Sequence, residues 1–172
     1  MEEVLLFSRL EAGGLAFTPE PLDLQGLCER LRDEVFSATR GRCPILLETE
    51  GALSHAHGDE TLLRHILSNL LSNAVKYSEE GSVVMATLWR SGNDAVLTVS
   101  DRGIGIPSDG LAKLFEAFYR ARNAAAFAGT GLGLVVVKRC VDLHGGTISI
   151  ESTEGVGTTV RVVLPLFAST TS

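Results

Sequence analysis

One helical segment of the sequence carries a polar stripe that could bind a metal ion and phosphate. Successive residues of an α-helix lie about 100° apart around its axis. On this spacing the apolar residues of segment 61–77 cover one half of the helix, and a separate stripe is formed by His65, Asn69, Asn73 and Lys76. Carboxamide oxygens one turn apart can ligate a hydrated Mg²⁺, and a lysine below them can bind phosphate oxygens. The stripe therefore suits a nucleoside triphosphate, but a solvated outer helix face has the same pattern.

The loop DRGIGIP at residues 101–107 is a second candidate for ligand binding, because it follows directly after an expected strand. Gly103 and Gly105 allow the backbone to curl closely around a flat ligand. The carboxylate of Asp101 could accept a hydrogen bond from an exocyclic amine such as N6 of adenine, and a buried acceptor selects for ligands that donate. An ordinary turn would also explain these residues.

A third candidate, GTGLGL at residues 129–134, opens an expected helix. Free N–H groups and the helix dipole bind phosphate well at such a position when glycines allow close approach. The spacing matches neither the dinucleotide-binding fingerprint nor the phosphate-binding loop that ends in GK[ST]. A plain glycine-rich helix entry is the alternative interpretation. The candidate phosphate-binding residues are Gly129, Thr130, Gly131, Leu132 and Gly133.

The hydrophobic pattern predicts the elements that position these segments. Helices are expected over residues 24–38, 61–77, 111–118 and 132–143, and strands over residues 44–50, 82–89, 95–100, 147–152 and 158–164. Residues 1–12 have the pattern of the tail of another helix, and residues 121–128 are expected to form a mobile loop. The order of these elements predicts a two-layer α/β sandwich, with helices packed on one face of a mixed sheet.

Composition limits the classes of function. The chain has 172 residues, of which 45% are apolar, enough for one compact domain. The formal net charge of −6 argues against nucleic acid as a partner. The three cysteines lack the spacing of a zinc site or redox pair, and no apolar run reaches the roughly 18–20 residues that span a bilayer. We therefore expect a cytoplasmic fragment with no direct membrane contact.

Four motifs together resemble the catalytic ATP-binding domain of sensor histidine kinases. In that family's order and rough spacing, the asparagine, first-glycine, phenylalanine and second-glycine boxes are similar to HILSNLLSNAVKYS, DRGIGIP, LFEAFYR and GTGLGL. The resemblance covers residues 20–166, and FSRLEAG at residues 7–13 resembles the end of the dimerisation helices. It implies the Bergerat-type fold shared with gyrase, MutL and the heat-shock chaperones, whose mixed sheet is mostly antiparallel.

The resemblance divides the chain into a helix remnant at residues 1–14 and a catalytic domain at residues 15–172. It implies ATP and Mg²⁺ as cofactors and assigns a role to each candidate residue. Asn73, with help from Asn69, would bind Mg²⁺, and Lys76 would approach the phosphate. Tyr77 would pack near the nucleotide. Asp101 would hold the adenine amine, and Gly103 and Gly105 would shape the pocket of the base.

The second-glycine box would let a lid close over the phosphates. Phe115 and Phe118 would anchor the start of the lid, although their spacing with Leu114 also suits ordinary core. Thr158 and Thr159 fall in the family's terminal GxGT strand region, where a structural or pocket-lining role is expected.

The phosphoacceptor of the family is missing from this sequence, because none of the four histidines is followed by an acid and a proline. The implied function is therefore to present the ATP γ-phosphate to a histidine on a separate dimerisation domain, from which a response regulator receives it. The fragment is expected to be monomeric and its parent homodimeric. His144 is expected to support the HGG turn, and His65 to have a structural or pocket-rim role.

Two alternatives use the same residues. One is an ATP-hydrolysing conformational clamp of the same superfamily, whose ATPases carry a glutamate one turn before the metal-binding asparagine. Asn69 stands at that position and cannot act as a general base for water, which favours the kinase. The other is a non-catalytic nucleotide-binding interaction module, which the lack of polar side chains in residues 124–128 would suit.

Overall fold

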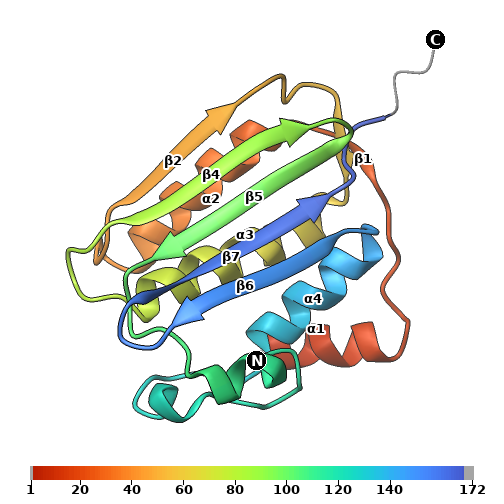
Figure 1. Ribbon diagram of the computed structural model, residues 1–172. Coiled ribbons are helices and arrows are strands. Elements are labelled where there is room, and N and C mark those ends of the chain that lie inside the picture. The colour runs from red at the N-terminus through yellow and green to blue at the C-terminus, as the bar shows by residue number, and fades with distance from the viewer. Residues whose placement is uncertain (1, 169–172) are drawn as a thin grey trace.

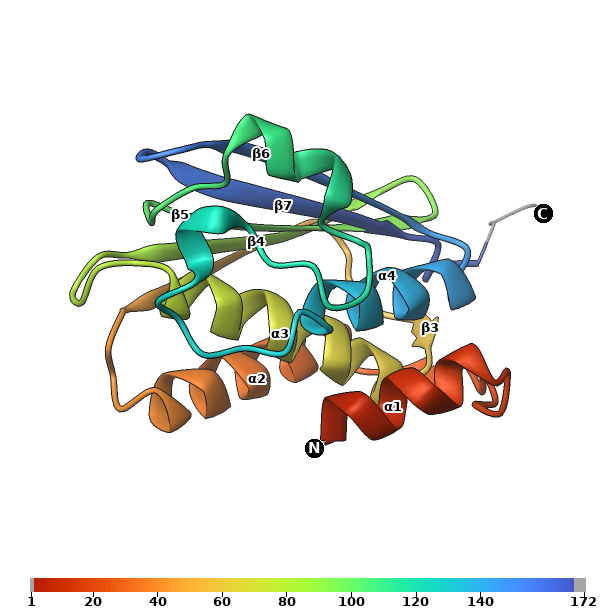
Figure 2. The same cartoon turned by 90° about the horizontal axis from the view of Figure 1, so that it is seen from below.

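The computed structural model describes residues 2–168 as a five-stranded sheet covered on one face by helices (Figures 1 and 2). The outer ends of both predicted domain ranges, residues 1 and 169–172, lie outside the described residues. The sheet has the order β2-β4-β5-β7-β6. Its strands are β2 (Ile45–Glu50), β4 (Val84–Ser91), β5 (Asp94–Asp101), β6 (Thr147–Thr153) and β7 (Gly157–Leu164). Only β2 and β4 pair in parallel, which confirms the predicted two-layer sandwich with a mostly antiparallel sheet.

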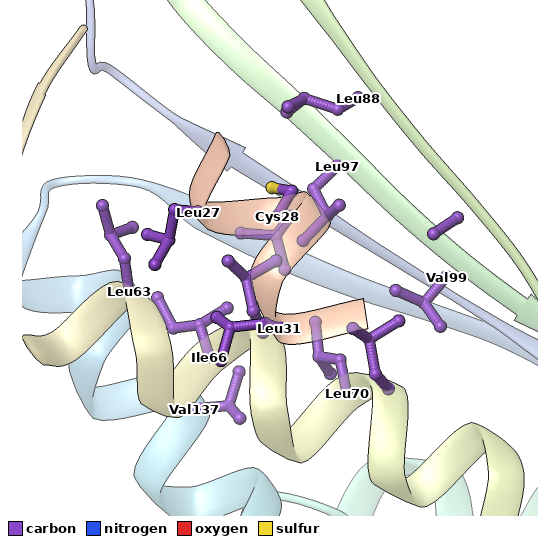
Figure 3. Close-up of a cluster of buried hydrophobic side chains, with 14 of the residues drawn as sticks. Leu27, Cys28, Leu31, Leu63, Ile66, Leu70, Leu88, Leu97, Val99 and Val137 are labelled. Atoms are coloured by element: carbon purple, nitrogen blue, oxygen red, sulfur yellow. The ribbon is translucent and has the colours of Figure 1, made fainter. Parts of the chain in front are cut away.

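Three amphipathic helices form the second layer, and a fourth packs at its edge. They are α2 (Leu24–Ala38), α3 (Glu60–Lys76) and α4 (Gly133–Leu143), with α1 (Glu2–Glu11) beside α4. Figure 3 shows apolar side chains of α2 and α3, among them Leu27, Ile66 and Leu70, clustered beneath the sheet that carries Leu97 and Val99 of β5. This buried interface fixes α3, and therefore its polar stripe, against the centre of the sheet.

Asp59 caps α3, and His144 ties that cap to the end of α4. Asp59 Oδ1 accepts from the N–H of Leu62 at 3.2 Å, and Oδ2 accepts from the N–H of Thr18 at 3.0 Å. The N–H of Asp59 donates to His144 Nε2 at 3.1 Å, while His144 Nδ1 lies 2.9 Å from the carbonyl of Cys140. Since that carbonyl needs a donor, the proton is on Nδ1. The expected structural role of His144 at the turn is confirmed.

Replacing Asp59 with alanine is expected to lower the free energy of unfolding by about 1–2 kcal/mol, because the helix cap and the bond to Thr18 are both lost. Urea unfolding followed by circular dichroism measures the change. Asp23→Ala is the matched control, since Asp23 caps α2 through Gly26 at 3.0 Å but is exposed. A cost no larger than that of the control would contradict the role of the buried cap.

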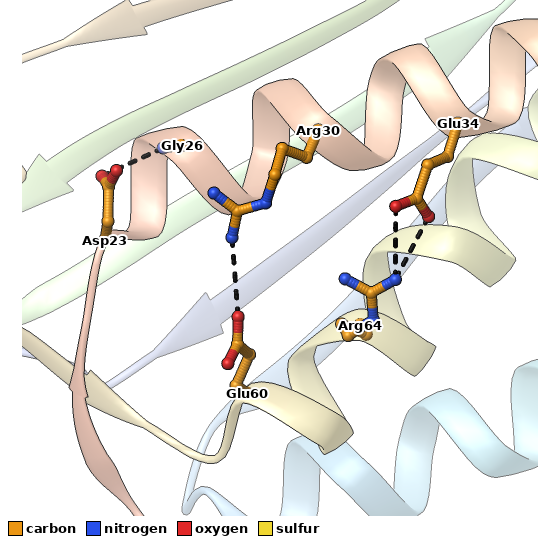
Figure 4. A network of polar contacts seen from close by, with 6 residues as sticks. All are labelled: Asp23, Gly26, Arg30, Glu34, Glu60 and Arg64. Carbon is orange, nitrogen blue, oxygen red and sulfur yellow. Dashed lines mark hydrogen bonds and ion pairs between the residues drawn. The ribbon is translucent and has the colours of Figure 1, made fainter.

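Ion pairs cross between the exposed sides of α2 and α3 (Figure 4). Arg30 pairs with Glu60 at 3.5 Å, and Arg64 pairs with Glu34 at 3.2 Å. Exposed pairs of this kind contribute little to stability. The apolar contacts therefore hold the two helices together.

The structure corrects three predictions. The helix expected over residues 111–118 is wrong: a 3₁₀ helix, η1 (Ser108–Lys113), covers its start and turns follow, because a segment this short does not sustain an α-helix unless tertiary packing supports it. Phe118 is 63% exposed with a φ of +67°, so its interpretation as core is wrong. The residues 121–128 contain a short 3₁₀ helix, η2 (Arg122–Ala124), while their mobility stays a prediction.

The sequence pattern also missed a small antiparallel sheet of β1 (Glu20–Leu22) and β3 (Ala56–Gly58). Each strand has only three residues, too few to show alternation. The cysteines are free and buried, as expected. Among residues 2–168, no helix has the length and apolar character needed to cross a membrane.

Candidate functional site

A cavity of about 310 Å³ lies where α3, the end of β5 and the loops before α4 meet. All but two of the candidate residues line it: Asn69, Asn73, Lys76, Tyr77, Asp101, Gly105, Gly129, Thr130, Gly131 and Gly133. The exceptions are Gly103, which is buried beneath Tyr77, and Leu132, whose side chain lies in the interior. Leu132 can therefore contact a ligand only through its backbone. The fold brings the three candidate segments to a single cavity.

A carboxylate lines this cavity. Asp101 ends the central strand β5 opposite Thr158 of β7, and its Oδ1 accepts from the N–H of Gly103 at 2.8 Å. Burial raises the pKa of the Asp101 carboxyl, and hydrogen bonds from the backbone of Gly103 and Thr158 partly offset that rise. Ile150 and Val160 line the cavity nearby. An acceptor among apolar walls suits a flat ligand with an exocyclic amine.

Two cations line the cavity beside Gly129. Lys76 Nζ donates to the carbonyl of Ala128 at 2.6 Å, and Arg120 donates to the carbonyls of Ala124, at 2.7 Å, and Phe127. A Cβ added at Gly129 would lie 3.2 Å from Lys76 Nζ and 3.8 Å from Arg120 Nε. A glycine-rich backbone flanked by two cations can bind an anion such as phosphate.

The two carboxamides of α3 lie between the carboxylate and the start of α4. Asn69 Nδ2 donates to the carbonyl of His65 at 2.8 Å, which fixes the amide orientation. Asn69 Oδ1 therefore faces Gly133, and a Cβ added there would lie 3.1 Å from it. The side chain of Asn73 lines the same cavity one turn further along.

The donor set around these carboxamides limits which metal ion could bind. Across residues 2–168, no group of three or more His, Cys, Asp or Glu side chains is arranged to hold a metal. A metal at Asn69 and Asn73 would therefore complete its coordination with ligand phosphates and water. That oxygen set fits Mg²⁺, which retains several waters, and does not fit zinc.

Comparison with known proteins decides the family. Residues 58–168 match the family described as histidine kinase-, DNA gyrase B-, and HSP90-like ATPase. The chain belongs to this family. It is an ATP-binding catalytic domain of the histidine kinase type, which confirms the sequence-based resemblance.

Named relatives agree with this family. The circadian input-output histidine kinase CikA of Synechococcus elongatus is 38% identical over 170 residues, which cover 96% of this chain and 22% of that protein. The histidine-protein kinase/phosphatase MprB of Mycobacterium tuberculosis is 38% identical over 163 residues, which cover 92% of this chain and 31% of that protein. The chain thus spans about a third or less of the length of these relatives.

Solved structures give the same result. ShkA, crystallised at full length with AMPPNP, matches with a TM-score of 0.84 and 29% identity over 98% of this chain and 35% of that chain. A mycobacterial MprB structure matches with a TM-score of 0.76 and 30% identity over 86% of this chain and 99% of that chain.

The structure adds residues to the lining of this cavity that the sequence did not reveal. Arg120 ends LFEAFYR, and its position after two aromatic residues was the available signal. Asn123 Nδ2 donates to the carbonyl of Gly105 at 2.9 Å and so joins the segment before GTGLGL to the loop of residues 101–107. Asn123 Oδ1 is buried, and within residues 2–168 it has no hydrogen-bond partner. Glu3 of α1 also lines the cavity, and no local pattern marked it.

The lid, defined here as residues 118–131, is closed at its base by its backbone. The N–H of Phe118 donates to the carbonyl of Gly131 at 3.1 Å, and Phe127 packs edge-on against Tyr77 with ring centroids 5.0 Å apart. The lid carbonyls contact the two cations, and Tyr77 contacts the lid through its ring. A phosphate that binds Lys76 and Arg120 must therefore replace lid carbonyls.

Proposed function

We propose that this chain holds Mg-ATP and presents the γ-phosphate to a histidine on the dimerisation domain of a parent sensor histidine kinase. A response regulator then receives the phosphoryl group. The composition of the cavity lining carries the proposal, since an acceptor for an amine, two cations and two carboxamides line the same cavity. Phosphoryl transfer depends mainly on positioning and charge neutralisation, which such a site provides.

Each group has one task in this proposal. Asp101 accepts from the adenine N6 amine, and Tyr77 packs near the nucleotide. Lys76 and Arg120 bind phosphate oxygens together with the N–H groups of residues 129–133. Asn73, assisted by Asn69, holds Mg²⁺, which neutralises phosphate charge when it is bound.

The orientation of Asn69 favours the kinase over an ATP-hydrolysing clamp. Its amide is fixed by the bond to the carbonyl of His65, and a carboxamide cannot take a proton from water. An incoming imidazole needs no such base because it is itself the nucleophile. The interaction-module alternative loses its main support as well, because the Ala-rich part of the lid engages Lys76 and Arg120 through backbone carbonyls.

The wider setting belongs to the same proposal. Helix α1 is the remnant of a dimerisation helix, and the catalytic domain extends from residue 15. The fragment is cytoplasmic and by itself monomeric. The parent is a homodimer whose dimerisation domain supplies the phosphoacceptor. The exposed side chains of Val4 and Leu5, 42% and 67% accessible, lie on the helix that would continue into that domain.

Titration with a non-hydrolysable ATP analogue, with and without Mg²⁺, tests the nucleotide site. Mg²⁺ is expected to strengthen binding to the wild-type chain. In Asn73→Ala this strengthening is expected to fall about tenfold, the effect of losing one ligand bond, while the Mg-free affinity stays the same. Asn93→Ala, in the β4–β5 turn, is the matched control.

Two results would contradict the proposal. Equal Mg²⁺ dependence in Asn73→Ala and wild type would remove Asn73 from the metal site. A folded wild-type chain that binds no nucleotide would refute the function. Transfer of label from γ-³²P-ATP to a dimerisation domain supplied in trans then tests the kinase step itself.

A further inference from the structure

A carboxylate from the N-terminal helix lies at the phosphate end of the nucleotide cavity. Glu3 Oε2 accepts from the hydroxyl of Thr130 at 2.8 Å, although 127 residues separate the two. A Cβ added at Gly133 would lie 3.7 Å from Glu3 Oε1 and 3.1 Å from Asn69 Oδ1. Glu3 thus faces the glycine-rich loop of residues 129–133 and the carboxamide of Asn69. A carboxylate is unexpected at this place in a phosphate site, because its charge repels the phosphate.

Two apolar contacts along α1 hold Glu3 in this position. Leu6 is buried in the core, and the ring of Phe7 packs edge-on against Phe118 with centroids 6.2 Å apart. At the far end of the helix, Glu11 forms an ion pair with Arg139 of α4. Figure 2 shows α1 lying beside α4, below the sheet. The carboxylate is therefore positioned by a docked helix and not by a freely rotating chain end.

We propose that Glu3 is a specificity-determining residue that weakens the binding of nucleoside triphosphates relative to diphosphates while α1 is docked. The inference rests on the proposed function, because it requires the base at Asp101 and the phosphates near Thr130. In that orientation Glu3 approaches the outermost phosphate. Like charges repel more strongly at short range in a partly enclosed site, so the γ-phosphate is opposed more than the β-phosphate.

Thr130 makes this opposition chemically specific. Its hydroxyl accepts from the N–H of Leu132 at 3.2 Å and donates its only proton to Glu3. While the hydroxyl donates this hydrogen bond to Glu3, it cannot donate to a phosphate oxygen. A triphosphate therefore competes with Glu3 for the donor and is also repelled by its charge.

The coupling is reciprocal by thermodynamic linkage. If docked α1 weakens triphosphate binding by some factor, a bound triphosphate weakens the docking of α1 by the same factor. A diphosphate has a smaller effect. Movement of α1 can thus change which nucleotide the domain retains without altering the pocket at Asp101.

Glu3→Gln tests the charge alone, because glutamine retains an oxygen that accepts from Thr130. Titrations with AMPPNP and ADP are made without Mg²⁺ and repeated with it. We expect Glu3→Gln to bind AMPPNP about three- to tenfold more tightly in the absence of Mg²⁺ and ADP less than about twofold more tightly. Glu11→Gln is the matched control from the same helix and should change neither affinity, since its half-exposed ion pair contributes little to docking.

The outcomes separate this inference from the proposed function. Equal changes for AMPPNP and ADP in Glu3→Gln, or no change, would overturn the specificity role. Weaker AMPPNP binding with Mg²⁺ would also overturn it, because Glu3 would then be acting as a metal ligand. A wild-type chain that binds neither nucleotide would refute the nucleotide site itself, and the inference with it.

Hydrogen exchange provides a readout that affinity alone does not. We expect AMPPNP to accelerate amide exchange in α1 of the wild-type chain, because the triphosphate weakens docking, whereas ADP should not. In Glu3→Gln the acceleration should disappear. Protection of α1 by AMPPNP in the wild-type chain would overturn the proposed opposition.

Discussion

Replacing Asp101 with asparagine is expected to lower the affinity for an ATP analogue by about 10- to 100-fold without destabilising the protein. The remaining oxygen can still accept from the N–H of Gly103, now 2.8 Å from Oδ1. The new NH₂ group would then face the adenine N6 amine, so that two donors oppose one another. Calorimetric titration measures the affinity. Asp94→Asn, at the opposite end of β5, is the matched control.

The same substitution should slightly raise the thermal midpoint at neutral pH. Burial raises the pKa of the Asp101 carboxyl in the folded chain, so folding opposes its ionisation. The stability from this group is complete below its unfolded-state pKa and is lost as the pH rises through the folded-state pKa. At neutral pH the ionised, buried carboxylate of Asp101 lowers the free energy of unfolding of the wild type. Asparagine does not ionise, so the variant lacks this loss of stability. The difference in midpoint should therefore shrink in acid.

Two results would count against this account of Asp101. Unchanged nucleotide affinity would show that its carboxylate does not accept from the ligand. A clear fall in the thermal midpoint at neutral pH would show that the carboxylate supports the β5–β7 end of the sheet more than it serves the ligand.

Replacing Gly103 with alanine is expected to abolish nucleotide binding and to lower the free energy of unfolding by about 3 kcal/mol. A Cβ added at Gly103 would lie 2.2 Å from the carbonyl oxygen of Tyr77 and 2.7 Å from its carbon. That carbonyl accepts from the N–H of Ile104 at 3.1 Å, and both belong to the backbone. Neither backbone segment can move without shifting the loop of residues 101–107 away from the end of α3.

Gly14→Ala provides the matched control, because a Cβ there would approach only the carbonyl of Arg9, at 3.8 Å. Chemical unfolding and analogue titration are made on both variants. If Gly103→Ala is as stable as Gly14→Ala and binds the analogue equally well, the close approach of the loop of residues 101–107 to α3 is not required for the site.

Periodicity allowed much of the fold to be predicted. The helices α2 and α3 and the strands β4 and β5 were predicted, because the pattern of each element lies within its own residues. The predictions failed where the signal was short. The segment of residues 111–118 was too short to specify an α-helix, and β1 and β3 are too short to alternate.

The candidate site divides in the same way. The types and spacing of Asn69, Asn73, Asp101 and the glycines of residues 129–133 marked three polar segments, and the four motifs in order identified the family. Their roles toward Mg²⁺ and the phosphates stay predictions. What the sequence determined by itself was local: which residues face together on one helix, and which loops can approach a ligand.

Only the tertiary structure decided which distant groups meet. Arg120 reaches the cavity because the lid folds back on itself, and its partners are backbone carbonyls, which no side-chain pattern encodes. Glu3 meets Thr130 because α1 packs beside α4, with 127 residues between the two side chains. Local hydrogen bonding and hydrophobic periodicity depend on a few neighbouring residues, whereas these contacts depend on how all the helices pack against the sheet.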